Sequence, residues 1–312
     1  MKIYLKHILL ILLMPFFYSA MAQESRFLIA NLYDGQSVAY TEILDTFRDR
    51  NPGYDFHYFS SVSSIKPEKY DRILFLQQGE GSAVITNVSG DIIESPLTFG
   101  DVIVLRKGEH IETDVPLGFL AFSVPDTPPA DLPSFIRPDW DSYITDVPGG
   151  CATEIDAYRR ILLTWSKDVG EYIFHSLNAH RVRIRDSFSH YHPKDIGFDE
   201  FYLVQMTEPG AKILISENVD LIKEPENVSA EQAANLIREY ELHEGDLVYI
   251  PRGVMHRGVG GVLAQVITVP GFIPGSEIGL DHLIRKINER LVLEFEHSLP
   301  FNYEFSTEPV IR

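Results

Sequence analysis

The second half of this chain repeats short segments of its first half, and this internal repeat restricts the fold more than any other feature. Residues 100–108 (Gly-Asp-Val-Ile-Val-Leu-Arg-Lys-Gly) recur, in similar form, 145 residues later at 245–253. Residues 70–77 recur 128 residues later at 198–205. Each copy is typical of a short apolar strand flanked by turn residues. Matched copies of this kind predict two related β domains in one chain.

Regions outside the repeat predict a few helices and a linker. The matched segments lie 17 residues further apart in the second half, and these extra residues include Ser229 and Gln232 in a capping-box pattern. A short helix near 229–240 is therefore expected, with an acidic loop as the alternative. Six prolines within 124–148 indicate an extended linker. Apolar residues at three- and four-residue steps predict an amphipathic helix near 277–297.

These patterns, in a chain of 312 residues of which 45% are hydrophobic, predict an all-β protein of two tandem barrels with a few peripheral helices. The expected division is a signal peptide (1–22), a first β domain (23–124), a Pro-rich linker (125–150), a second β domain (151–276), and a C-terminal helix and tail (277–312).

The first residues predict export. A basic start, an apolar run over 8–17 and the small-x-small pattern at Ala20-Met21-Ala22 are typical of a signal peptide cut after Ala22. The apolar run is shorter than the roughly 20 residues that a membrane-spanning helix needs. We therefore expect a secreted or periplasmic protein without stable membrane insertion after cleavage. An uncleaved anchor or a buried helix is the alternative.

Net charge limits the binding partners that we expect, and cysteine content limits the disulfides that the chain can form. The formal net charge is −18, and loss of the two signal lysines brings the mature chain to about −20. Such a charge repels phosphate backbones, so we expect no nucleic-acid partner. Cys151 is the single cysteine, which excludes an intramolecular disulfide. It is interpreted as either a small buried apolar residue or a reactive thiol.

Residues with metal-binding chemistry gather in the second half. His190 and His192 stand two residues apart, so on a strand both would point to the same face. Glu200 begins the next apolar segment, and His256 follows a tight turn. Three imidazoles and one carboxylate suit one divalent transition metal such as Fe, Mn, Zn or Ni, without deciding which.

In these residues the second half resembles the cupin superfamily. The second cupin motif, Gly-x5-Pro-x-Gly-x2-His, is matched at 245–256 and ends at His256. The first motif is matched by His190, His192 and Glu200, but seven residues separate His192 from Glu200 where three or four are usual. The resemblance implies double-stranded β-helix (jelly-roll) barrels and these four residues as metal ligands. Asp199 and Asp195 are rivals for the carboxylate position.

The first half resembles a cupin that has lost its metal ligands. At the two offsets, Val62 and Ser64 stand in the places of the paired histidines, Arg72 in that of the glutamate, and Ile111 in that of the last histidine. An arginine at a carboxylate position would repel a cation. We expect this half to pack against the other or to form a homodimer.

Several further residues of the second half have two interpretations. Tyr202 and Tyr249 are candidate catalytic residues that could donate a proton or a hydrogen bond to a ligand on the metal, although packing is the simpler role. Three arginines alternate along 181–185. They would form either a clamp for a substrate carboxylate or an outer face that balances acidic surface.

The resemblance does not name a reaction, because cupins include dioxygenases, decarboxylases, isomerases and lyases. The favoured hypothesis is an exported metal-dependent enzyme acting on a small polar molecule such as an organic acid, a phenol or a sugar derivative, with an Fe(II) dioxygenase placed first. A Mn or Zn isomerase or lyase is the alternative. A metal-assisted small-ligand-binding protein and a storage bicupin are the non-catalytic hypotheses.

Overall fold

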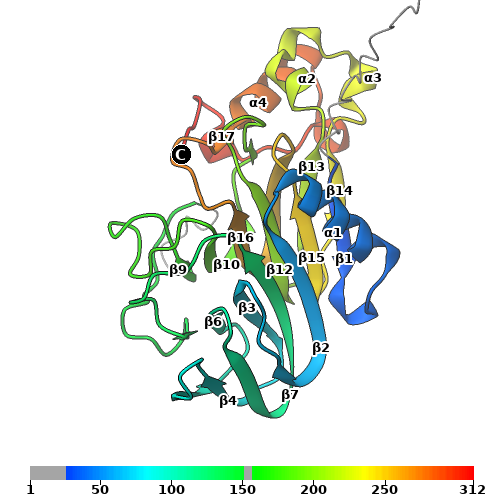
Figure 1. The fold of residues 1–312 in the computed structure, drawn as a ribbon. Coiled ribbons are helices and arrows are strands. Elements are labelled where there is room, and N and C mark those ends of the chain that lie inside the picture. Colours follow the sequence, from blue (N-terminus) through cyan, green and yellow to red (C-terminus); the bar gives the residue numbers. More distant parts are fainter. Residues whose placement is uncertain (1–25, 151–156) are drawn as a thin grey trace, which may run out of the picture.

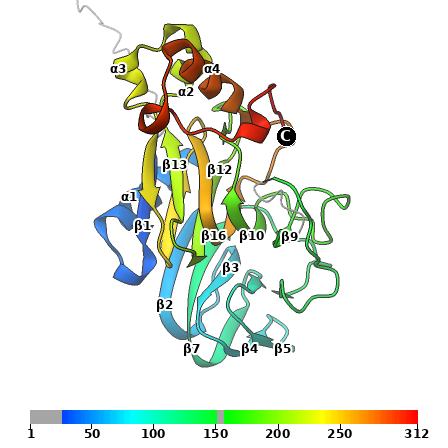
Figure 2. The same ribbon diagram turned by 180° about the vertical axis from the view of Figure 1, so that it is seen from behind.

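A computed structural model describes residues 26–150 and 157–312. Two antiparallel β-sheets make up most of it, and a group of short helices covers one end (Figures 1 and 2). The predicted fold class, all-β with a few peripheral helices, is confirmed. The predicted signal peptide and Cys151 lie outside the described residues. No helix in the described parts of the chain is long and apolar enough to cross a membrane.

The first sheet has seven strands, paired in the order β5-β4-β7-β3-β6-β8, with β2 also on β7. Aliphatic side chains from β2 to β7 form one buried cluster, so the sheet curls around its own core. The strands are β2 (Asp55–Ile65), β3 (Asp71–Gln78), β4 (Gly81–Thr86), β5 (Ile92–Leu97), β6 (Val102–Leu105), β7 (His110–Val124) and β8 (Phe135–Ile136).

The second sheet has ten strands and a similar curled core, to which β10, β12, β13, β15 and β16 contribute. Its first strand comes from the N-terminal region, because β1 pairs with β15. The strands are β1 (Leu28–Asn31), β9 (Arg159–Leu163), β10 (Asn178–Asp186), β11 (His190–Tyr191), β12 (Asp199–Thr207), β13 (Lys212–Ser216), β14 (Arg238–Glu241), β15 (Asp246–Ile250), β16 (Met255–Val269) and β17 (Ile278–Gly279).

The two sheets share a buried aromatic and aliphatic interface, into which helix α1 (Val38–Arg50) also packs. Phe47 of α1 lies at its centre, with ring centroids 6.0 Å from Phe122 of the first sheet and 5.1 Å from Phe201 of the second. Burial of large aromatic side chains is among the strongest sources of packing energy. The two halves are therefore joined by a common core in addition to their linker.

The helices at the end of the second sheet are α2 (Val219–Lys223), α3 (Ala230–Ala233) and α4 (Asp281–Leu291), accompanied by short 3-10 turns at Pro225–Asn227, Phe295–His297 and Tyr303–Phe305. A further 3-10 turn, Leu32–Asp34, precedes α1. The predicted capping box at Ser229 and Gln232 is present. Helices α3 and α4 are shorter than the helices predicted near 229–240 and 277–297. Residues 238–241 pair with β13 as strand β14, and residues 278–279 pair with β11 as strand β17. Strand pairing thus replaced helix at one end of each segment.

Strand register confirms the repeat and corrects one of its alignments. Arg72 lies opposite Leu105, and Glu200 lies opposite Ile250. The first residue of each pair is related by the predicted offset of 128 and the second by the predicted offset of 145. His190 pairs with His256, and the corresponding pair in the first sheet is Ile65 with Ile111. Ile65, not Val62, therefore occupies the place of His190. The physical reason is the length of the connection to the next strand, because Ile65 stands seven residues before Arg72 whereas His190 stands ten residues before Glu200.

Candidate metal centre

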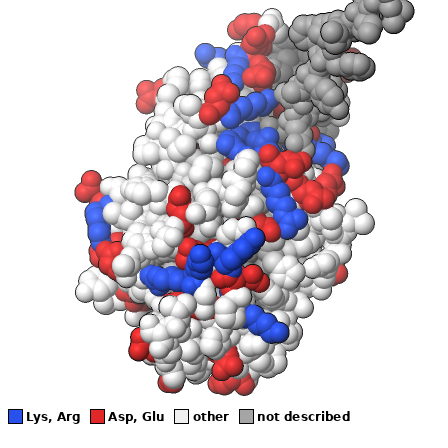
Figure 3. Space-filling model, viewed as in Figure 1, with Lys and Arg blue, Asp and Glu red and all other residues white. Residues whose placement is uncertain are grey.

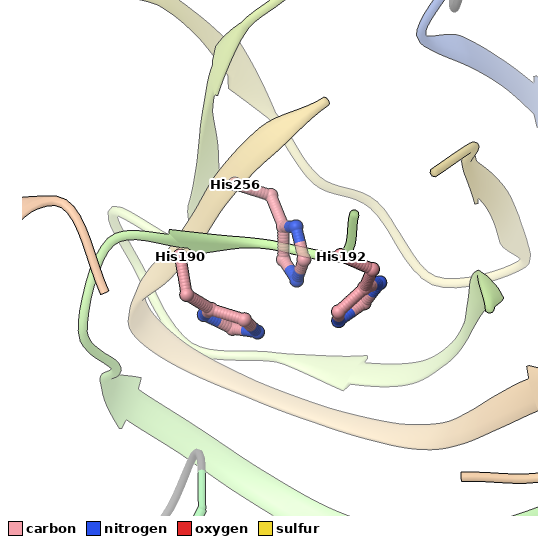
Figure 4. Close-up of side chains that lie close together, drawn as sticks. All are labelled: His190, His192 and His256. Atoms are coloured by element: carbon pink, nitrogen blue, oxygen red, sulfur yellow. The ribbon is translucent and has the colours of Figure 1, made fainter. Parts of the chain in front are cut away.

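Three histidines converge inside the second sheet, at the end that the helices cover (Figure 4). His190 of β11 lies directly opposite His256 of β16, with ring centroids 4.1 Å apart. His192 follows two residues after His190 and points to the same side, 5.1 Å from the His256 ring. All three are buried, and one nitrogen from each lies within 4.8 Å of the others. This geometry can hold a metal ion.

The electrostatics of the group also suit a metal. Burial lowers the pKa of His190 to about 3 and that of His256 to about 4, and it lowers the pKa of His192 well below its ordinary value. Neutral imidazole is the form that coordinates metals. The His190 Nδ1 atom donates to the Phe188 carbonyl at 3.1 Å, which leaves the lone pair on Nε2. The Nε2 atoms of all three rings are buried without a hydrogen-bond partner among the described residues, an arrangement that a bound metal would satisfy.

Glu200 supplies a carboxylate to the same group. Its strand, β12, places it between Ile250 and Thr268, and its Oε1 atom lies 3.1 Å from the Nε2 atom of His256. Burial raises its pKa to about 8, because no cation among the described side chains offsets the loss of solvent. The structure therefore groups the three predicted histidines and places the fourth predicted ligand, Glu200, in contact with one of them, His256. Their donor set of three imidazoles and one carboxylate fits a divalent transition metal.

The long spacer between His192 and Glu200 folds into a compact turn. The Gly197 amide donates to the Pro193 carbonyl at 2.8 Å, and the Gly253 amide donates to the His192 carbonyl at 2.7 Å. A Cβ atom at Gly197 would lie 2.5 Å from the Pro193 oxygen, so the turn has no room for a side chain there. Asp195 lies exposed on this turn, away from the buried histidines. The extra residues therefore leave the ligand positions intact.

We call His190, His192, His256 and Glu200 the metal group. Asp199, the other rival for Glu200, faces away from this group and toward the interface between the sheets. Its buried carboxylate accepts hydrogen bonds from Arg50, Asn51, Tyr249 and Arg252. Burial by itself would raise its pKa, but the two guanidinium groups outweigh that effect and lower it. Asp199 is thus a structural anion behind the ligand strand. It connects α1 to the turn that precedes His256.

The two candidate catalytic tyrosines lie on opposite faces of the sheet. Tyr202 points into the second core, with its ring 6.2 Å from that of His256. Tyr249 belongs to the interface core, and its hydroxyl group donates to Asp199 at 2.7 Å. The structure therefore places Tyr202 near the histidines and Tyr249 apart from them.

Arg183 and Arg185 are exposed on β10, whereas Arg181 is buried and lies beside Gly100 of the first half. Arg181 donates to Gln205 and Asp139, while Arg183 and Arg185 lie 3.8 and 3.9 Å from Glu208. Figure 3 shows basic side chains interspersed with acidic ones on the face that it draws. The interpretation of these arginines as an outer face therefore fits Arg183 and Arg185 but is wrong for Arg181, which is buried.

A cavity of about 320 Å³ opens beside the metal group. It is bordered by Glu200 and by a second acidic side chain that the motifs did not reveal, Glu277, whose Oε1 atom lies 3.9 Å from the His190 Nε2 atom. The lining further includes Arg159, Ile161, Leu163, Trp165, Asn178, His180, Thr268, Phe272, Pro274 and Arg312. No local sequence signal identifies these residues, because they come from distant segments that meet only in the folded chain.

Comparisons with known proteins point to the same architecture. Residues 198–273 match the model of the JmjC domain. No curated protein matches the sequence. Similar solved structures include the formate complex of Lactobacillus farciminis oxalate decarboxylase, with 14% identity over 80% of this chain and 84% of that chain at a TM-score of 0.47. A variant of Bacillus subtilis oxalate decarboxylase has 11% identity over 79% and 74% at a TM-score of 0.44.

The solved structures are too distant to support an argument about activity. The JmjC match carries more information, because its residues include Glu200 and His256 and span β12 to β16 of the second sheet. The JmjC domain is a cupin-type domain, so this match supports the resemblance to the cupin superfamily that the histidine motifs predicted.

Proposed function

We propose that this protein is an exported, metal-dependent cupin enzyme that acts on a small organic molecule. One observation carries the proposal: three neutral histidines converge beside Glu200, and Glu200 borders a cavity large enough for a small substrate. Buried polar groups without partners are costly unless a ligand satisfies them. Their concentration at one place favours a functional site.

The residues of the chain account for binding and for protection of the site from water. Glu200 and the three histidines would hold the metal, which supplies Lewis-acid or redox chemistry when bound. Apolar residues of the cavity, such as Leu163 and Phe272, exclude water, which strengthens electrostatic interactions inside. Three histidines and one glutamate leave coordination positions open for a substrate and a small co-substrate. On that ground we place an Fe(II) dioxygenase first.

Glu277 favours the alternative, a Mn- or Zn-dependent isomerase or lyase. It is a buried carboxylate 3.9 Å from His190 and borders the cavity, where it could accept or return a substrate proton. The two reactions differ in their need for oxygen. A protein that binds metal and ligand without turnover would instead support the binding-protein hypothesis.

The test begins with metal content. We expect protein purified without chelators to contain close to one equivalent of a transition metal by elemental analysis. The His256→Ala variant should lose it, because one of three converging imidazoles is removed. His243→Ala is the matched control, since His243 is largely exposed outside the site and its loss should leave the metal in place. A wild-type protein without transition metal would refute the enzyme proposal.

Turnover and export are tested separately. Metal-loaded protein would be screened for oxygen consumption with organic acids, phenols and sugars, and product formation without oxygen would identify the isomerase or lyase. Export is proposed from the first 22 residues alone. N-terminal sequencing of protein recovered outside the cytoplasm should begin at Gln23, and recovery of uncleaved protein from the cytoplasm would contradict it.

A further inference from the structure

The lining of the cavity beside the metal group combines apolar and polar side chains. Its apolar part, called the aromatic wall below, consists of Ile161 and Leu163 of β9 and the rings of Trp165 and Phe272. Its polar part consists of the guanidinium groups of Arg159 and Arg312 and the side chains of His180 and Thr268, and Arg159 alternates with Ile161 and Leu163 along β9. An amphipathic cavity of this kind selects a ligand that has both an apolar body and a polar end.

The aromatic wall leads continuously to the metal group. Trp165 stacks on Phe272 with ring centroids 4.1 Å apart and an interplanar angle of 27°. Phe272 lies 5.3 Å from Phe198, and Phe198 lies 4.0 Å from the His192 ring. A planar group that packs along this wall would therefore have its reactive end close to the metal ligands.

The two guanidinium groups of the lining lie near the histidines and also near the Glu277 carboxylate. The Arg312 guanidinium lies 5.1 Å over the Phe188 ring, which in turn stacks on His190 at 4.4 Å. Arg312 Nη1 also donates to the Gly150 carbonyl at 3.1 Å, which fixes the orientation of the guanidinium group. Arg159 is held by a bond from Nη1 to the Val147 carbonyl at 3.3 Å. Planar guanidinium groups recognise carboxylates through paired charge-assisted hydrogen bonds.

Two further polar atoms of the cavity lining lack a hydrogen-bond partner among the described residues. His180 Nε2 and Thr268 Oγ1 are both buried and make no hydrogen bond with any described residue. Both residues belong to the second sheet and border the cavity. Buried groups of this kind are normally satisfied, so a ligand that enters the cavity is the natural source of their missing hydrogen bonds.

We propose that the cavity binds an aryl carboxylate, with its ring against Trp165 and Phe272 and its carboxylate on Arg159 and Arg312. A cavity of about 320 Å³ lies at the small end of ligand sites, which suits one substituted aromatic ring. A short dicarboxylate would leave the aromatic wall uncovered. The inference deepens the proposed function and rests on it in taking this cavity as the substrate site.

The sequence offers a direct spectroscopic test. The chain has two tryptophans, Trp165 in the cavity wall and Trp140, which is 67% exposed. In a Trp140→Phe protein, fluorescence reports on the cavity wall alone. We expect 4-hydroxybenzoate to change this signal with saturation. The neutral analogue 4-hydroxybenzyl alcohol and the ring-free anion oxalate should each bind at least tenfold more weakly.

Matched arginine variants identify the carboxylate site. Arg159→Met or Arg312→Met should weaken 4-hydroxybenzoate binding at least tenfold. Arg160→Met is the control, because Arg160 is the next residue on the same strand but pairs with Asp146 and does not line the cavity. Thermal unfolding verifies that each variant is folded, and Arg312 near the end of the chain provides a second test if the Arg159 variant does not fold.

The outcomes separate this inference from the proposed function. Equal binding of the acid and the alcohol, oxalate binding as tight as that of 4-hydroxybenzoate, or arginine variants that bind like the parent would each overturn the aryl-carboxylate inference. Titration of metal-loaded and metal-stripped protein shows whether recognition depends on the metal. Selective binding to a protein that never takes up metal would refute the enzyme proposal and leave the cavity inference standing.

Discussion

Replacement of Asp199 by alanine should destabilise this protein strongly, although Asp199 touches neither the metal group nor the cavity. Its carboxylate is fully buried and pairs with Arg50 and Arg252, whose side chains are only 15% and 17% exposed. Removal of one partner from a buried ion pair costs about 3–5 kcal/mol, because the remaining charge loses its compensation. Asn51 and Tyr249 also lose their acceptor, but such losses within one network do not add. We therefore expect a loss of about 4 kcal/mol in the free energy of unfolding.

The assay is equilibrium unfolding in urea with metal-free protein, which separates the effect from metal binding. Glu42→Gln is the control, because the ion pair between Arg26 and Glu42 is exposed and such pairs contribute about 0–1 kcal/mol. Asp199→Asn keeps the shape but not the charge and should fall between the two. The pH response has a defined sign. The folded-state pKa of Asp199 is lowered, so its contribution is present above the unfolded value near 4 and is lost as the pH falls. A loss below about 1 kcal/mol for Asp199→Ala would refute this account of the network.

Three further predictions concern the metal group. Because the pKa of Glu200 is raised to about 8 without metal, the folded protein retains a proton that the unfolded chain has released, and metal-free stability should fall by about 1–2 kcal/mol between pH 6.5 and 8. Urea midpoints of the wild type and of Glu200→Gln across this pH range measure the loss of stability. The same dependence of the midpoint on pH in both proteins would contradict the prediction. Gly197→Ala should weaken metal affinity at least tenfold in a competitive chelator titration, since the new Cβ atom collides with the turn after His192. Unchanged affinity would show that this turn can shift without moving the metal ligands. Tyr249→Phe should lower stability by about 1–2 kcal/mol through the lost hydrogen bond to Asp199 and leave metal content unchanged, whereas Tyr202→Phe is the variant expected to lower kcat. An unchanged kcat for Tyr202→Phe would assign that residue to packing.

The sequence by itself determined the repeated β architecture and the residues of the candidate metal group. Both depend on short-range patterns: alternation along a strand places His190 and His192 on one face, and the turn after Ile250 positions His256. The same alternation separates Glu200 from Asp199, which the structure shows on opposite faces of β12. Local periodicity is enough for such assignments.

Tertiary structure alone decided what surrounds those ligands. The pairing of β1 with the second sheet, the ion-pair network of Asp199 and the placement of Glu277 beside His190 join residues that are distant in the chain. The connection after Ile65 is shorter than the one after His190, and a fixed repeat offset cannot reveal this difference. Long-range pairing depends on how strands align across a sheet and on how sheets pack, and neither leaves a local pattern. The candidate metal ligands could therefore be predicted from the sequence, whereas the cavity beside them emerged only from the fold.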